Sequence, residues 1–232
     1  MVTCPGVRDF RSRPDRRPGD RAPGREAVVE LLGLLALGEL LAFERMVFDA
    51  RLAPDLGRRA ALSEAAVGEI RNYRLIADRL HALGADPAEA MAPFREAFRS
   101  FDASTSPRDW LEALVKVYLG DAVADDFFRA VSSGLEDADR TVIETVLAES
   151  GAADLAAAEI RAAVEADESV TGRLSLWARR LVGEGINRAQ GVAAANERLT
   201  GIIVGDGGTL DALLRRLTRA HQDRMKSVGL NN

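Results

Sequence analysis

From residue 27 onward, apolar side chains recur every three or four residues, the spacing that places them on one face of an α-helix. Proline and glycine interrupt this pattern at intervals, and no stretch alternates long enough to form a sheet. The pattern therefore predicts an all-helical chain. We expect its long helices over residues 27–52, 57–83, 106–132, 137–166, 170–199 and 209–228.

The connections between these helices predict how they are arranged. Short turns join the first helix to the second and the third to the fourth, so each of these pairs should be antiparallel. About 23 residues, 84–106, separate the two pairs and contain a shorter helix that begins at Asp86-Pro87. A connection of that length can cross a bundle. The chain is therefore predicted to be all-α, a ferritin-like four-helix bundle with one long crossover and two additional C-terminal helices.

Two local features sharpen this prediction. We expect the third bundle helix to begin with Ser106 as its hydroxyl cap and Pro107 at its first position. The two C-terminal helices carry apolar faces that must be covered, either by the bundle or by a second copy of the chain in a homodimer. These faces contain Leu174, Leu181, Ile186, Val192, Leu210, Leu213, Leu214 and Leu217.

Residues 1–26 differ from the rest of the chain. They hold seven arginines, four acids and four of the eight prolines, with almost nothing apolar. Such a segment cannot bury enough surface to offset its loss of entropy, which predicts a disordered tail before a single helical domain over 27–230. The basic tail is compatible with an electrostatic arm for RNA or an acidic protein partner, or with a leader that has no function.

Composition excludes several classes of function. The net charge of -5 argues against a nucleic-acid coat or a binder of anionic membranes, and no apolar run is long enough for a membrane span. With one cysteine the chain cannot form an internal disulfide or a thiolate metal cluster, so we expect a cytoplasmic protein. Only two histidines are present, and any chemistry must therefore depend on carboxylates.

Each of the four bundle helices has an acid on its apolar face near mid-length. Glu39 is the only charged residue between Leu31 and Phe43. A buried carboxylate costs several kcal/mol or takes up a proton unless a cation or donors compensate it. One acid from each helix is also how a di-iron carboxylate centre is built, although chance alone can place acids in this way. The four acids are Glu39, Glu69, Asp121 and Glu149.

Three stretches, residues 34–40, 110–121 and 176–184, resemble the actinobacterial ferritin-like proteins related to the di-iron hydroxylases that modify methylthio-isopentenyl-adenosine in tRNA. The resemblance covers about residues 27–230. For active members it implies two irons held by a Glu, a Glu-x-x-His, a third acid and a second Glu-x-x-His. These irons activate dioxygen to hydroxylate the substrate.

The resemblance assigns candidate metal ligands position by position. Glu39 matches the first acid, and Glu69 opens the first Glu-x-x-His, in which Asn72 stands at the histidine position. Asp121 matches the third acid, with Asp125 as an alternative one turn further on.

The second motif departs in the same way. Glu149 opens it, but Ala152 occupies the histidine position, so both imidazole ligands of the iron are absent. His81 lies too far along its helix to replace them, and we expect His221 at the surface of the last helix.

Without iron, three interpretations of the inward acids remain: an all-oxygen site for Mn²⁺, Mg²⁺ or Ca²⁺, protonated or hydrogen-bonded acids, or acids more exposed than the pattern suggests. Nearby arginines, including Arg45, are expected to turn mostly toward solvent. The sequence therefore predicts a ferritin-like protein with a degraded di-iron site and a role in binding or assembly. The alternative is a metal-dependent hydroxylase acting on a modified nucleoside or a small molecule. Ferritin-style iron storage is the least favoured class.

Overall fold

Helices make up nearly all of the described chain. The computed structural model describes residues 23–148, 151–205 and 209–231. Within these residues there is no strand, and no helix is both long and apolar enough to cross a lipid bilayer. The first helix begins at Arg25, two residues earlier than predicted, while residues 1–22 of the predicted tail lie outside the described residues.

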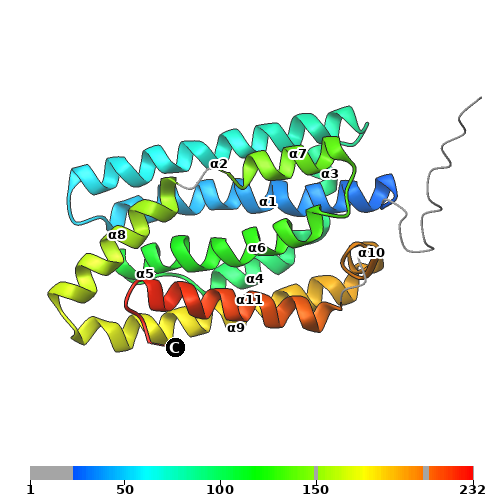
Figure 1. Ribbon diagram of the computed structural model, residues 1–232. Coiled ribbons are helices and arrows are strands. Elements are labelled where there is room, and N and C mark those ends of the chain that lie inside the picture. Colours follow the sequence, from blue (N-terminus) through cyan, green and yellow to red (C-terminus); the bar gives the residue numbers. More distant parts are fainter. Residues whose placement is uncertain (1–22, 149–150, 206–208, 232) are drawn as a thin grey trace, which may run out of the picture.

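The first two bundle helices form a long hairpin, as predicted. Helix α1 (Arg25–Asp49) continues into the short 3₁₀-helix η1 (Ala50–Leu52) and then turns into α2 (Leu56–Ala82). Asp55 caps α2, because its Oδ1 accepts a hydrogen bond from the backbone N–H of Arg58 at 2.8 Å. The two helices lie side by side along their length (Figure 1).

The connection to the second pair contains helices, as predicted. It consists of α3 (Pro87–Met91), the 3₁₀-helix η2 (Ala92–Phe94) and α4 (Arg95–Ser104). The side chain of Asp86 caps α3 by accepting the N–H of Glu89 at 3.0 Å. This segment packs along α1 and brings α4 to the opposite side of that helix from α2 (Figure 1).

The third bundle helix is not one continuous α-helix. It comprises α5 (Trp110–Val115), the π-helical turn η3 (Lys116–Gly120) and α6 (Asp121–Ser132). The prediction that Ser106 caps it is wrong. The cap is Asp109, whose carboxylate accepts the N–H of the third residue of α5 at 2.9 Å, and the helix begins three residues later than the predicted first position, Pro107. A π-helical turn is uncommon and frequently marks a functional site.

The fourth bundle helix, predicted to be continuous, is interrupted. It consists of α7 (Asp137–Val146) and α8 (Gly151–Ala166). At the end of α7 the carbonyl of Leu147 accepts a hydrogen bond from Arg129 Nη2 at 3.0 Å, so it is satisfied without a further helical turn. Glycine at the start of α8 also has a low helix propensity.

Three helices follow the bundle, where the pattern predicted two. They are α9 (Ser169–Ala195), α10 (Glu197–Gly205) and α11 (Leu210–Ser227). The helix predicted to reach residue 199 ends earlier because the side chain of Asn196 donates to the carbonyl of Val192 at 2.8 Å.

The C-terminal helices cover one side of the bundle. In Figure 1, α2 and α7 form the upper edge, α1 and α6 lie in the middle, and α9 and α11 form the lower edge. Helix α11 packs against α6, and α9 packs against α4 and η3. Their predicted apolar faces are therefore covered within the chain. The buried members are Leu174, Leu181, Leu213, Leu214 and Leu217.

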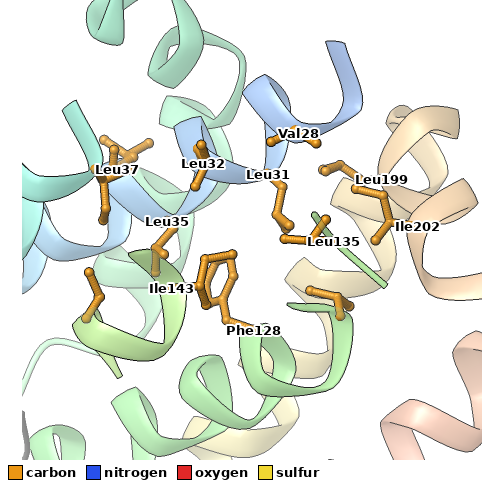
Figure 2. Packing of buried hydrophobic residues seen from close by; sticks show 14 of the residues in the cluster. Val28, Leu31, Leu32, Leu35, Leu37, Phe128, Leu135, Ile143, Leu199 and Ile202 are labelled. Carbon is orange, nitrogen blue, oxygen red and sulfur yellow. The ribbon is translucent and has the colours of Figure 1, made fainter. Parts of the chain in front are cut away.

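The apolar core joins these layers. Figure 2 shows that leucines of α1 meet Ile143 of α7 and Phe128 of α6, while Leu199 and Ile202 of α10 approach Val28 and Leu31. A second cluster at the other end of the bundle contains Trp110 and Trp177. A cavity lies near mid-bundle, beside Glu39.

Candidate functional site

A cavity of about 280 Å³ lies between the hairpin α1/α2, the helix α6 and the C-terminal helix α9. Most of its wall is apolar. Four phenylalanines contribute to it, two from α4 and two from α6. They are Phe98, Phe101, Phe127 and Phe128. Three of the four acids that the sequence singled out, Glu39, Glu69 and Asp121, belong to the polar part of the wall, together with Asp102 and Asp125.

Two acids and an amide meet on the α1/α2 side of the cavity. Glu39 is 8% exposed, and its Oε2 accepts a hydrogen bond from Asn72 Nδ2 at 3.1 Å. The amide of Asn72 also donates to the carbonyl of Val146 at 3.4 Å. Glu39 further hydrogen-bonds the carboxyl group of Glu69, which requires a proton on one of the two.

The buried position of Glu39 favours this proton on Glu39. Burial, followed by the charge of Glu69, raises the pKa of Glu39 to about 10, although the hydrogen bond from Asn72 acts in the opposite direction. Asp125 on α6 faces the same region. Burial, followed by the charge of Asp121, raises the pKa of Asp125 to about 7. At neutral pH, protonation therefore removes part of the negative charge from the cavity.

Asp121 is compensated by a cation. Arg45 Nη2 lies 2.6 Å from Asp121 Oδ2, and the two side chains are 14% and 33% exposed. Of the nearby arginines, which were expected to turn mostly toward solvent, Arg45 is the exception, because it lies on the cavity wall. Burial opposes the charge on Arg45, but Asp121, Asp102 and Asp49 outweigh it and raise the pKa of the guanidinium. Burial also raises the pKa of Asp121, against the effect of Arg45.

A buried lysine completes the charge balance at this end of the cavity. Lys116, in the π-helical turn, is 2% exposed and donates to Asp102 Oδ1 at 2.7 Å and to the carbonyl of Thr105 at 3.1 Å. Burial, followed by the charge of Arg45, lowers the pKa of Lys116. Arg45 and Lys116 thus lie among three acids, Asp49, Asp102 and Asp121, where α1, α4 and η3 meet.

The predicted ligands are only partly brought together. Glu39, Glu69 and Asn72 are in contact, whereas Asp121 is engaged by Arg45. Glu149 lies outside the described residues. Across the three described stretches of the chain, no three His, Cys, Asp or Glu side chains are arranged to hold a metal ion. The two positions that would carry histidine, Asn72 and Ala152, both line the cavity.

The two histidines lie away from this region. His81 is exposed near the end of α2. The prediction that His221 lies at the surface is wrong, because it is 1% exposed between α9 and α11 and its Nε2 lies 3.1 Å from the carbonyl oxygen of Ala178. Burial lowers the pKa of His221, which favours its neutral form.

Comparison with known proteins agrees with this architecture. A family model described as a ferritin-like domain of actinomycetes matches residues 22–206. The chain belongs to this ferritin-like family. No curated protein matches its sequence. The predicted ferritin-like, all-helical fold is therefore confirmed, both by this match and by the arrangement of the helices.

The donor set of this ferritin-like chain does not fit the di-iron centre that the resemblance implies. An imidazole would supply a neutral nitrogen donor, but Asn72 directs its amide N–H toward Glu39, and Ala152 has no donor. A guanidinium beside Asp121 adds a positive charge where a metal would need a negative one.

Proposed function

We propose that this ferritin-like protein works by binding a small molecule in its internal cavity rather than by metal catalysis. The observation that carries this proposal is the way in which the central acids are compensated. A proton and an amide satisfy Glu39, and a guanidinium satisfies Asp121. These groups belong to the chain itself, so the acids need no metal ion to remain in the interior.

The cavity supports the same proposal. Ligand sites are typically concave and mostly apolar, with a few polar groups that fix orientation. Here the apolar wall is combined with Asn72, Arg45 and a set of carboxyl groups. Neither Asn72 nor Ala152 provides an imidazole, so these two positions contribute only an amide group and a methyl group to the cavity wall.

A relation to the tRNA-modifying hydroxylases belongs to the same proposal. It rests on the short sequence stretches that resemble them and on the position of Glu39, Glu69 and Asn72 around one cavity. We interpret these residues as the remnant of a di-iron site, which would make this chain a binding member of a branch that contains enzymes.

Metal analysis of the full chain tests the proposal. The protein is loaded anaerobically with ferrous iron, desalted and analysed for metal, and we expect far less than the two irons of an active site. A variant with Asn72→His and Ala152→His supplies both missing nitrogen donors and should retain more iron than the wild type. Glu64→Ala, at an exposed position of α2, is the matched control for Glu39→Ala.

The opposite result has a clear form. Close to two irons per wild-type chain, lost in Glu39→Ala and kept in Glu64→Ala, would contradict the proposal and favour the metal-dependent hydroxylase.

Partners are part of the proposal too. A homodimer through the C-terminal helices stays a prediction, although the leucines expected at such an interface are covered within the chain. Sedimentation at several concentrations measures it. An RNA-binding role of the basic N-terminal segment also stays a prediction, and comparing the RNA affinity of the full chain with that of a chain lacking residues 1–22 tests it.

A further inference from the structure

Two buried polar atoms without a partner belong to residues that line the cavity. Among the described residues, six buried side-chain nitrogen or oxygen atoms lack a hydrogen-bond partner within the protein. Two of the six belong to residues that line the cavity, and both are the Nε of an arginine, Arg45 on α1 and Arg188 on α9. An Nε–H can only donate. These two N–H groups therefore lack a hydrogen-bond acceptor.

In each residue another nitrogen of the guanidinium group faces a carboxylate elsewhere. Arg45 uses Nη2 to pair with Asp121 at 2.6 Å. Arg188 uses Nη2 to approach Glu184 on its own helix at 3.6 Å. In both residues the Nε–H is left over, and a buried donor without an acceptor costs free energy that a bound oxygen atom would recover.

The charge of the wall restricts what that acceptor can be. Five acids and two arginines line the cavity, and even with Glu39 protonated the acids outnumber the arginines, so a carboxylate or phosphate would meet more negative than positive charge. A cation would bring no acceptor and would face both guanidinium groups, while three of the acids already have a partner in Arg45, Lys116 or Asn72. A neutral oxygen satisfies the donors without either penalty. The five acids are Glu39, Glu69, Asp102, Asp121 and Asp125.

The volume sets the size of the ligand. An engineered protein cavity of about 150 Å³ binds benzene, so a cavity of about 280 Å³ has room for about eleven non-hydrogen atoms. Phe98, Phe101, Phe127 and Phe128 give it an aromatic wall.

We infer that the cavity binds an uncharged, mainly apolar molecule of this size, whose carbonyl, ether or hydroxyl oxygen accepts a hydrogen bond from Arg45 Nε or Arg188 Nε. This inference rests on the proposed binding function and names its ligand class.

Four probes of similar size and different polarity test the ligand class by calorimetric titration of the full wild-type chain. Benzylacetone is the neutral ketone, butylbenzene lacks an acceptor, hydrocinnamate is an anion and phenylbutylamine is a cation. We expect benzylacetone to bind about 3- to 10-fold more tightly than butylbenzene, which is the effect of one hydrogen bond. The anion and the cation should each bind at least about 10-fold more weakly than benzylacetone.

Variants on α9 assign the donor. Arg188→Met removes one Nε–H, and Arg180→Met changes an exposed arginine of the same helix as a control. We expect Arg188→Met to weaken benzylacetone about 3-fold or more without weakening butylbenzene, and Arg180→Met to change neither. If Arg188→Met still binds benzylacetone more tightly than butylbenzene, Arg45 is the donor, and Arg45→Met should abolish this preference. A preference that stays intact in both variants would overturn the assignment.

The outcomes separate the two levels of the proposal. Equal or tighter binding of butylbenzene would overturn the acceptor inference while leaving the apolar binding function in place. Tightest binding of the anion or of the cation would overturn the neutral ligand class. If none of the four probes bound, the proposed binding function of the cavity would fail, and this inference with it.

Discussion

Glu39 and Arg45 show how single residues on one helix face define the site. Arg45 follows Leu34, Gly38 and Leu41 in steps of four and three residues, and Glu39 lies on the neighbouring line with Leu35 and Ala42, so that the two lines form one stripe facing the cavity. The stripe correctly predicts an inward Glu39. Extending it by one more turn would also have placed Arg45 inside, and this signal was available in the sequence. The acid that pairs with Arg45, Asp121, lies on α6, so the spacing of residues along α1 cannot identify it.

Replacing Glu39 by glutamine should stabilise the protein at neutral pH. Burial raises the pKa of Glu39 to about 10, whereas in the unfolded chain it is about 4.3, so folding at neutral pH requires uptake of a proton. The stability of the wild type relative to Glu39→Gln should therefore be highest below about pH 4 and fall as the pH rises toward about 10. At neutral pH we expect the variant to be more stable by about 1–3 kcal/mol, measured by urea unfolding.

The matched control is Glu64→Gln, at an exposed position of α2. Its stability should follow that of the wild type at every pH. A large loss of stability in Glu39→Gln would show that the carboxylate holds a cation and would contradict a protonated Glu39.

Removing Arg45 should be costly because it leaves Asp121 without its cation. For Arg45→Met we expect a loss of about 2–4 kcal/mol in the free energy of unfolding, somewhat less than for a fully buried pair because Asp121 is one-third exposed. Arg45→Met combined with Asp121→Asn should recover part of the loss. The exposed pair of Arg99 and Glu96 on α4 supplies the control, and Arg99→Met should leave the unfolding midpoint unchanged. Equal effects of Arg45→Met and Arg99→Met would argue against a structural ion pair.

At the scale of elements, helix identity was predictable and helix boundaries were less so. Apolar periodicity correctly placed the four bundle helices and the crossover. The wrong boundaries occur where a polar side chain intervenes. Asp109 takes the role expected of Ser106, Arg129 satisfies the end of α7, and Asn196 ends α9. The π-helical turn before Asp121 has no sequence signal that we could identify. It depends on packing against α8 and α9.

Close approach of two elements makes a specific prediction at Gly33. A Cβ added there would overlap the backbone carbonyl of Ala90, so α1 and α3 can approach each other only with glycine. Gly33→Ala should destabilise the protein by about 1–3 kcal/mol in spite of its better helix propensity. Gly183→Ala on α9, where nothing lies within 4 Å of the added atom, should be neutral or stabilising. Thermal unfolding of both variants measures the difference, and a stabilising Gly33→Ala would refute the close contact.

For the whole molecule, the C-terminal helices complete the domain and form one side of the cavity. Leu181, Arg188 and Val192 of α9 line it together with residues of the bundle. The sequence predicted the acids of the cavity and the missing histidines. It could not predict the cavity itself, or Arg188 on its wall, because these depend on how α9 crosses the bundle. A buried His221 was missed for the same reason, since α11 lies between α6 and α9 rather than outside the fold.

The end of the described chain should contribute to stability. After α11, Val228 and Leu230 are buried at 0% and 2% exposure, and the backbone N–H of Asn231 donates to Ser175 Oγ at 2.8 Å. Leu230→Ala should therefore cost about 2–4 kcal/mol in the free energy of unfolding. Leu176→Ala on α9, where the leucine is 65% exposed, should cost less than about 0.5 kcal/mol. If the two variants unfolded alike, the packing of this terminal segment would be wrong.

The most direct measurement is infrared difference spectroscopy of wild type against Glu39→Gln near neutral pH, before and after addition of ferrous iron. Because the pKa of Glu39 is raised to about 10, we expect this residue to keep its proton near neutral pH. The carbonyl stretch of a protonated carboxyl group should then appear in the wild type alone and stay unchanged when iron is added. Absence of that band, or its loss as iron binds, would show that Glu39 is a carboxylate available to a metal and would contradict the account.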